Sequence, residues 1–371
     1  MKIRIIPSIP GYRTLDKYIL GKFLRTYLFG IAMMVIILVV FDYVEKVDDF
    51  TELKAPWKEI VWDYYMNFIP QFISQFSALF TFISVIFFTS KMAMQTEIVA
   101  ILSGGVSFRR FMWPYIIGAT IITALSLALS LWVIPEGQKA SVEFQRKYMK
   151  NQQTLVYPEH VYRQIEPGTF AYVRGYSPGV ERVPFFAIER FDGAELTETL
   201  DAANASFDEE TKRWYAPRYM IYSRDEDGKL SGKQYRNLDT LINLDVRELG
   251  DISGVVKTLT YEELNDFLAQ QRSKGSDEVF LIEVERHARF SYPLSTIILT
   301  IIGVAFSSRK IRGGMGMHIG MGIALCFSYL MLGRVFEQIA ISGSIAPWIG
   351  VWLPNIVFAI IAVIVYQKAP K

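Results

Sequence analysis

Six long apolar segments constrain this chain of 371 residues more than any other feature. A helix needs about 20 apolar residues to cross a bilayer core, where every backbone polar group must be satisfied within the segment. The expected spans are 26–43, 68–88, 115–134, 290–306, 317–336 and 346–366. Because 51% of the residues are hydrophobic yet 20% are charged, part of the chain must also lie in water. We therefore expect an α-helical polytopic membrane protein with one large water-exposed insert.

The distribution of basic residues predicts how the spans are oriented. Lys and Arg gather before the first span, in the second and fourth connections, and at the C-terminus; these residues are Lys2, Arg4, Arg13, Lys17, Lys22, Arg25, Lys91, Arg109, Arg110, Arg309, Lys310, Arg312, Lys368 and Lys371. The first connection, "VEKVDDFTELKAPWKE", is net acidic, and the fifth, "QIAISGSIAP", has no basic residue. Positive charge stays on the cytoplasmic side, so both termini are predicted to be cytoplasmic and the large insert to be extracytoplasmic.

The insert of about 150 residues between the third and fourth spans is predicted to be a separate β domain. Short runs such as "TFAYVRGY" and "RVPFFAIERF" are separated by the turn signals "EPG", "SPG", "FDG" and "DEDG". This pattern is typical of an antiparallel sandwich or jelly roll. A helix at about 260–273 should follow, with Thr260 and Glu263 forming a capping box and Gly275 ending the helix. The predicted domains are 1–134, 135–288 and 289–371.

The second connection, "MAMQTEIVAILSGGVSFRRF", is too long to be a simple turn. It predicts a helix at about 92–107, on which Met94, Ile98, Ile101 and Leu102 share one face, with the carboxylate of Glu97 at the edge of that face. Gly104 and Gly105 would end this helix, and Arg109 and Arg110 would mark the return to the membrane. Two interpretations remain open on physical grounds: a coupling helix that offers Glu97 to a cytoplasmic partner, or an interfacial turn whose charges only fix topology.

The composition excludes several classes of function. The net charge of +2 does not favour nucleic-acid binding, and the one cysteine, Cys326, excludes an intramolecular disulfide. "RGGMGMHIGMG" lacks the Lys-Ser/Thr of a phosphate loop, and His160, His287 and His318 lack metal-ligand spacing. We expect no catalytic residues, no bound metal and no cofactor in this chain.

Five stretches, in order, resemble the LptF/LptG permease family, the membrane subunits of the lipopolysaccharide-exporting ABC transporter. They are "LDKYILGKFLRTYL", "TEIVAILSGGVSFRRF", "VIPEGQKASVEFQRKY", "RHARFSYPLSTIILTIIGVAFSSRKIRGGMG" and "GSIAPWIGVWLPNIVF". The first two are similar to the N-terminal interface helix and to the coupling helix of that family. The first two also resemble the LptG type more than the LptF type.

The resemblance implies a non-catalytic permease subunit in the inner membrane of a cell with a Gram-negative envelope. It implies a second LptF/LptG-type permease as heterodimer partner, two copies of a cytoplasmic ATPase that uses the ATP, and a single-span partner with its own jelly roll in the periplasm. Residues implied to contact the ATPase are Glu97, Ile98, Ile101, Leu102, Gly104 and Arg109.

Lipopolysaccharide acyl chains need an apolar path, because each buried methylene stabilises them in the membrane by about 0.8 kcal/mol. The residues expected to contact the lipid are Lys46, Arg334, Phe170, Tyr172 and Phe185. With Trp214, the three sheet aromatics have the alternative of being ordinary sandwich core. Arg334 has the alternative of pairing with Glu337 one helical turn later.

The outer end of the first span departs from the family. In "VVFDYVEKVDDF" acidic residues outnumber Lys46, and an acidic rim repels lipid A phosphates. A cargo with fewer phosphates, a bridging divalent cation or a basic partner permease would each resolve this conflict.

Two rival functions come from other classes. A mechanotransmission or sensor protein would couple an extracytoplasmic domain to a cytoplasmic ATPase without moving lipid. A scaffold would need no ATPase and hence no coupling helix.

Overall fold

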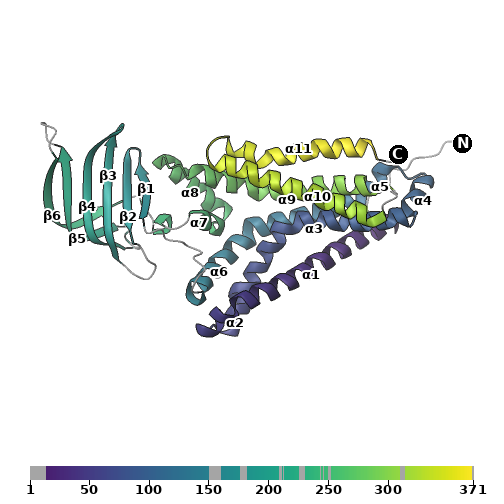
Figure 1. The fold of residues 1–371 in the computed structure, drawn as a ribbon, viewed down its shortest axis with the longest axis horizontal. Coiled ribbons are helices and arrows are strands. Elements are labelled where there is room, and N and C mark those ends of the chain that lie inside the picture. The colour runs from purple at the N-terminus through teal and green to yellow at the C-terminus, as the bar shows by residue number, and fades with distance from the viewer. Residues whose placement is uncertain are drawn as a thin grey trace. The chain divides into compact units, whose positions relative to one another are not determined.

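The computed structural model describes residues 14–149, 160–175, 182–208, 211, 213–224, 230–242, 244, 246–249, 252–309 and 314–369. The predicted turns "SPG" and "DEDG" lie outside the described residues. The chain divides into two compact units, Met1–Gly137 with Val284–Lys371, and Gln138–Glu283. We call them the membrane unit and the β unit (Figure 1).

Six helices of the described chain are long and apolar enough to cross a membrane, which confirms the predicted fold class. The six ranges are Thr14–Glu52, Trp57–Met94, Phe108–Gln145, Val279–Ser307, Gly316–Ile341 and Pro347–Gln367. The elements in them are α1 (Thr14–Glu52), α2 (Trp57–Glu59), η1 (Ile60–Tyr65), α3 (Met66–Met94), α5 (Phe108–Ala128), η2 (Leu129–Val133), α6 (Ile134–Tyr148), α9 (Val279–Ser307), α10 (Gly314–Ile341) and α11 (Pro347–Gln367).

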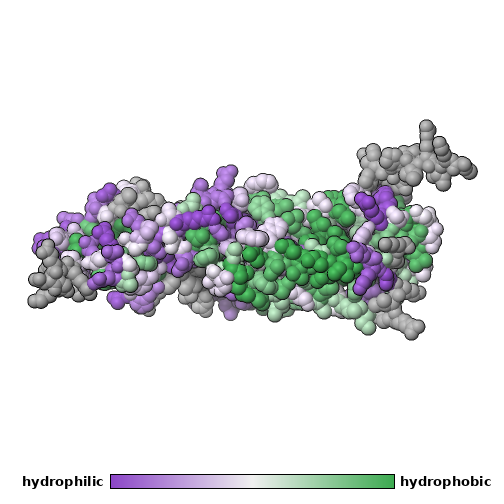
Figure 2. Space-filling view, turned by 90° about the horizontal axis from the view of Figure 1, so that it is seen from above, coloured by the Kyte–Doolittle hydropathy of each residue, from purple (hydrophilic) through white to green (hydrophobic). Residues whose placement is uncertain are grey.

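The surface of the membrane unit is strongly apolar. Figure 2 shows hydrophobic residues gathered over its helices, with hydrophilic residues at the end of this band. On α1 and α10 many large apolar side chains are exposed, among them Phe29, Phe41, Phe327 and Met331. Such a face is stable against lipid or a partner helix and unfavourable in water.

Inside the membrane unit, aromatic side chains and a small residue hold α1, α3 and α5 together. Phe23, Phe88 and Tyr115 belong to one buried cluster. A Cβ added to Gly118 of α5 would lie 2.5 Å from the Phe23 ring of α1. Gly118 therefore permits the close approach of the two helices, as small residues do in membrane bundles.

The β unit contains one six-stranded antiparallel sheet in the order β1-β2-β3-β4-β5-β6. The strands are β1 (His160–Glu166), β2 (Thr169–Arg174), β3 (Arg182–Asp192), β4 (Glu195–Asp208), β5 (Arg213–Arg224) and β6 (Leu230–Leu241). An inserted antiparallel β domain was predicted, and it is present. Within the described residues, however, the strands follow chain order as a meander, whereas a jelly roll distributes them between two sheets with crossing connections.

A line of irregular positions crosses four of these strands. Pro184 and Pro217 cannot donate a ladder hydrogen bond, and Asn204 and Asn237 have positive φ of 52° and 58°. The ladders lack residue pairs at or beside each of them, while the register stays the same on both sides. Long strands can therefore bend here, and the two sides of the bend contribute to one core that includes Phe186 and Trp214.

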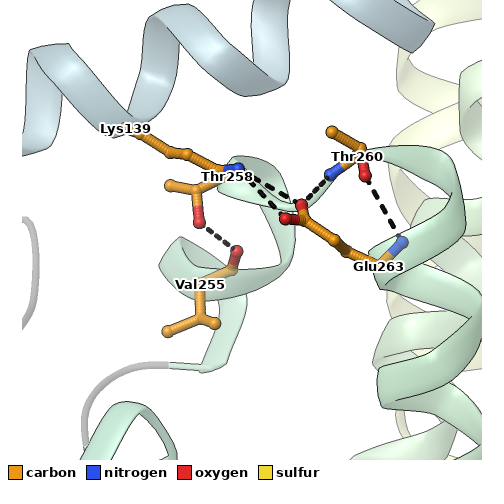
Figure 3. A network of polar contacts seen from close by, with 5 residues as sticks. All are labelled: Lys139, Val255, Thr258, Thr260 and Glu263. Carbon is orange, nitrogen blue, oxygen red and sulfur yellow. Dashed lines mark hydrogen bonds and ion pairs between the residues drawn. The ribbon is translucent and has the colours of Figure 1, made fainter.

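Helical elements follow the sheet: η3 (Val246–Leu249), α7 (Ile252–Thr258) and α8 (Tyr261–Lys274). The predicted capping box of α8 is present, with Thr260 Oγ1 accepting from Glu263 N and Glu263 Oε2 accepting from Thr260 N, and Gly275 ends the helix at φ 72°. Lys139 Nζ of α6 also donates to both carboxylate oxygens of Glu263, at 3.2 and 3.3 Å (Figure 3). One glutamate thus caps α8 and ties it to α6.

A buried ion pair joins α8 to η3. Lys274 Nζ lies 2.7 and 2.8 Å from the carboxylate oxygens of Glu248, and both side chains are almost fully buried. Gln271 Nε2 donates to the same carboxylate at 2.9 Å. Arg163 Nε of β1 donates to the Glu248 carbonyl at 2.7 Å, which connects this group to the sheet.

Candidate functional site

The connection between α3 and α5 contains a short helix, α4 (Glu97–Ser103). It is shorter than the predicted 92–107, because Met92 and Met94 still belong to α3. The break falls at Thr96, which has the left-handed φ of 61°, and Gly105 ends the turn at φ 84°. Figure 1 shows α4 at the end of the membrane unit where α1 begins and α11 ends.

Three of the four residues predicted to share the apolar face of this helix point into the membrane unit, whereas Met94 belongs to α3 and is 43% exposed. Ile98 is 1% exposed, and Ile101 and Leu102 are partly buried against the same cluster. The outward face carries Val99, which is 57% exposed, together with Ala100. The accessible surface of α4 therefore consists of Val99 and its neighbours, while Ile98 anchors the helix. Sequence periodicity identified the anchor and missed Val99.

Glu97 is held by the first helix of the chain. Its Oε2 accepts from Tyr18 Oη at 3.2 Å, and Tyr18 Oη in turn accepts from Lys22 Nζ at 2.6 Å. Glu97 is half-buried, and the Tyr18 hydroxyl connects its carboxylate to the ammonium group of Lys22. The structure therefore links the Glu97 carboxylate to α1, in the stretch that resembles the family's interface helix.

A second link between α1 and the turn is a bidentate ion pair. Arg110 Nη1 donates to Asp16 Oδ1 at 2.7 Å, and Arg110 Nη2 donates to Asp16 Oδ2. Asp16 is 3% exposed, so this pair is largely shielded from water. The neighbouring Arg109 is exposed and forms no such pair among the described residues. Neither Asp16 nor Arg110 was predicted as a coupling residue, because they lie 94 positions apart.

Lys46 lies in a buried polar cluster at the other end of α1. It is 7% exposed, its Nζ lies 2.5 Å from Asp42 Oδ1, and it also donates to Tyr64 Oη. The ring of Tyr64 stacks on Phe68, and Phe68 in turn packs against Phe72 one helical turn further along α3. The ammonium that was predicted to bind lipid is therefore neutralised within the chain in this arrangement.

Arg334 pairs with Glu337 as the alternative interpretation predicted. Arg334 Nη1 donates to Glu337 Oε2 at 3.1 Å, and Tyr292 Oη of α9 donates to the same oxygen at 2.7 Å. The Arg334 side chain is 63% exposed all the same. It can keep its partner and still present donors to a ligand.

The four aromatics considered in the β domain fall on two different faces of the sheet. Trp214 is fully buried in the core. The register places Tyr172 opposite Ala187 and Phe185 opposite Ala203, on the face away from that core, and the two rings meet at 5.8 Å. Phe170 shares this face and contacts Phe191 at 5.7 Å.

We call this second surface the aromatic face; its partly buried or exposed members are Tyr162, Phe170, Tyr172, Phe185 and Met220. Burial raises the pKa of the Tyr162 hydroxyl, assisted by Glu189 and Tyr172. Burial also raises the pKa of the Asp201 carboxyl, which lies beside Met220 in the ladder. Burial thus favours the protonated forms of Tyr162 and Asp201 on this face.

Within the described residues, no three His, Cys, Asp or Glu side chains gather as metal ligands do.

The similarity to known proteins extends over most of the chain. The family model for "Lipopolysaccharide export system permease LptF/LptG" matches residues 17–368. The chain is also 21% identical, over 296 residues, to the lipopolysaccharide export system permease protein LptG of Escherichia coli K12, covering 79% of this chain and 81% of the relative. The same protein of E. coli O6:H1 matches to the same extent. Six spans, an inserted antiparallel sheet and a family match over nearly the full length show that this chain belongs to the LptF/LptG family of lipopolysaccharide export permeases.

Proposed function

We propose that this protein is the LptG-like permease subunit of an ABC transporter that extracts lipopolysaccharide from the inner membrane and passes it to a periplasmic bridge for export to the outer membrane. The observation that carries the proposal is the family match across residues 17–368. The subunit itself is not an enzyme; ATP is used by a separate ATPase.

The distribution of Lys and Arg supports an orientation for this permease. Both termini and α4 lie on the cytoplasmic side, and the β unit lies in the periplasm. The two units are joined in sequence at Gly137–Gln138 and Glu283–Val284, within α6 and α9.

In this proposal α4 is the coupling helix. The ATPase subunit covers the exposed Val99 and approaches Glu97, while Ile98, Ile101 and Leu102 hold α4 in the membrane unit. Movement of α4 then reaches α1 along two paths, through the Glu97–Tyr18 hydrogen bond and through the turn fixed by the Arg110–Asp16 pair. Gly104 and Gly105 let the chain turn sharply, and Arg109 stays at the level of the lipid headgroups.

The outward apolar faces of α1 and α10 supply the contact with a second permease, and the cavity between the two subunits holds the acyl chains. Lys46 and Arg334 are the two cations proposed here to contact the phosphates or sugars of the cargo. Lys46 must exchange Asp42 for the cargo, whereas Arg334 has free surface already. Arg334 is therefore the better candidate in this chain for contact with the polar part of the lipid.

The aromatic face of the β unit is the proposed path beyond the membrane. Phe170, Tyr172 and Phe185 lie side by side, partly accessible, on this face, where burial raises the pKa of the Asp201 carboxyl. A single-span partner with its own jelly roll would receive the lipid from it. The complex would contain two copies of the ATPase and one partner permease.

Depletion in the native host tests this proposal. Loss of the chain should make newly synthesised lipopolysaccharide accumulate in the inner membrane, detected by density fractionation of labelled envelopes. Depletion of an unrelated inner-membrane permease is the control. If lipopolysaccharide reaches the outer membrane at the normal rate, the export function is wrong and a sensor of envelope state becomes the better account.

A further inference from the structure

A groove on the membrane unit, away from the outward faces of α1 and α10, has no assigned role. It has a volume of about 430 Å³, within the roughly 300–1,000 Å³ typical of small-molecule sites. Three helices line it: α5, α9 and α11. The lining side chains are Arg109, Met112, Trp113, Ile116, Ile298, Ile301, Ala359, Ala362, Val363 and Tyr366.

The lining of the groove is complementary to a lipid that has an apolar body and one anionic end. All but one of the lining residues are apolar or aromatic, and the exception is Arg109. Arg109 lies in the first turn of α5, and Tyr366 lies in the last turn of α11, where Phe108 meets it at 5.9 Å. Arg109 and Tyr366 therefore lie together at one end of an otherwise apolar groove, as basic and aromatic anchors do at a membrane surface.

The charge of Arg109 is available for a ligand. The adjacent Arg110 is committed to Asp16, but no acid among the described residues pairs with Arg109. Arg109 also stands at the N-terminal end of the 21-residue helix α5, where the helix dipole favours an anion. A phosphate beside it would be bound by a charge-assisted, forked contact.

We propose that this groove binds one anionic phospholipid, whose phosphate is held by Arg109 and one of whose acyl chains lies along Ala362 between α5, α9 and α11. In the orientation proposed above, this lipid belongs to the cytoplasmic leaflet. It would wedge the end of α11 against the turn that carries α4, so its occupancy would support the coupling end of the permease. This site is distinct from the cargo cavity assigned to the faces of α1 and α10.

Native mass spectrometry of the full chain in detergent tests the site with two probes, phosphatidylglycerol and phosphatidylcholine of equal chain length. The wild-type chain should retain one phosphatidylglycerol with at least about tenfold higher affinity than phosphatidylcholine, as expected for a charge-assisted contact. Arg109→Gln should remove that preference and Arg109→Lys should restore part of it. Arg25→Gln, an exposed arginine on α1, is the matched control and should leave the preference unchanged.

A second pair of variants tests the groove itself. Ala362→Phe fills the floor of the groove, since Ala362 is 5% exposed and lines it, and should abolish retention of the lipid. Ile360→Phe adds the same ring on the exposed side of α11, outside the lining, and should have no effect. Glycerol phosphate at a thousandfold excess should not compete, because it has no acyl chain.

Equal retention of the two lipids by the wild-type chain would overturn the proposal, and so would unchanged retention in Ala362→Phe. If a photoreactive residue at Ala359 in the assembled complex crosslinks to a protein rather than to phospholipid, the groove holds a partner helix and the lipid assignment is wrong. None of these outcomes depends on whether the chain exports lipopolysaccharide.

Discussion

Substitution of Val99 separates docking of the ATPase from folding of the permease. Val99 is 57% exposed, and full burial of a valine side chain contributes about 1.5–3 kcal/mol, so docking can gain about 0.9–1.7 kcal/mol from it. Val99→Asp loses that contribution and also places an unpaired carboxylate in the interface, which costs several kcal/mol more. The affinity for the ATPase subunit should therefore fall more than about hundredfold, since 2.7 kcal/mol is two orders of magnitude.

The assay is binding of the purified ATPase subunit to the full chain, co-expressed with its partner permease and held in nanodiscs. The melting temperature of Val99→Asp should stay near that of the wild type, because Val99 contributes little to the core. Ile98→Ala, one residue away, should behave in the opposite way: it removes a fully buried side chain and should lower stability by about 2–5 kcal/mol. Gln95→Glu adds negative charge on the exposed connection without removing apolar surface and serves as the matched control.

The reasoning is refuted if Val99→Asp binds the ATPase within twofold of the wild type while folding normally. The outward face of α4 would then be no docking surface, and the coupling would have to reside elsewhere. Loss of binding in Gln95→Glu to the same extent would also contradict it, because charge alone would then explain the effect.

Three further predictions concern stability. Lys274→Met leaves the buried Glu248 carboxylate without its counter-ion and should lower the stability of the β unit by about 3–5 kcal/mol, measured by hydrogen exchange in α8. The double variant Lys274→Met with Glu248→Leu should recover most of this stability, and an equal loss in both variants would contradict the prediction. The backbone N–H of Thr260 lowers the pKa of Glu263, so the stabilisation by Glu263 is complete above its unfolded pKa of about 4.3 and is lost as pH falls through the lower folded pKa. Hydrogen exchange in the first turn of α8 should therefore rise at that lower pH, and Glu263→Gln should remove this pH dependence. Gly118→Ala should destabilise the membrane unit by about 1–3 kcal/mol, because its Cβ would lie 2.5 Å from the Phe23 ring of α1. Gly21→Ala, whose Cβ would have nothing within 4 Å, is the control, and equal melting temperatures of the two variants would refute this packing.

Local patterns in the sequence were sufficient for the elements whose cause is local. The apolar runs identify the six spans because a bilayer accepts little else, and Thr260 with Glu263 identifies the start of α8 because a capping box needs only that spacing. The pairing of Arg334 with Glu337 was also open to prediction, since residues three apart meet on a helix.

Features that depend on distant residues or on a local interruption were missed. The Arg110–Asp16 pair joins positions 94 apart, which periodicity cannot reveal. Thr96 breaks the helix through a left-handed backbone, so an amphipathic pattern that runs from Met94 onward belongs to two helices rather than one.

The division of the β-domain aromatics between two faces could not be predicted for a related reason. The pairing register is the same on both sides of Asn204 and Pro217, but the alternation of faces reverses there. On β4, for example, the buried residues are Ala202 and Ala205, which are three positions apart rather than two. Regular alternation would place both side chains on one face, whereas the structure buries Trp214 and leaves Phe185 on the other face.

A photocrosslink tests whether lipopolysaccharide passes over the aromatic face: Phe185 is replaced by a photoreactive residue in the assembled complex, with lipopolysaccharide in the membrane. We expect an adduct with lipopolysaccharide that requires ATP and disappears in Val99→Asp. Tyr235, an exposed aromatic on the opposite face of the same sheet, should give no adduct. Absence of the adduct from Phe185 while the ATPase remains bound and active would contradict the account and favour a mechanotransmission protein that moves no lipid.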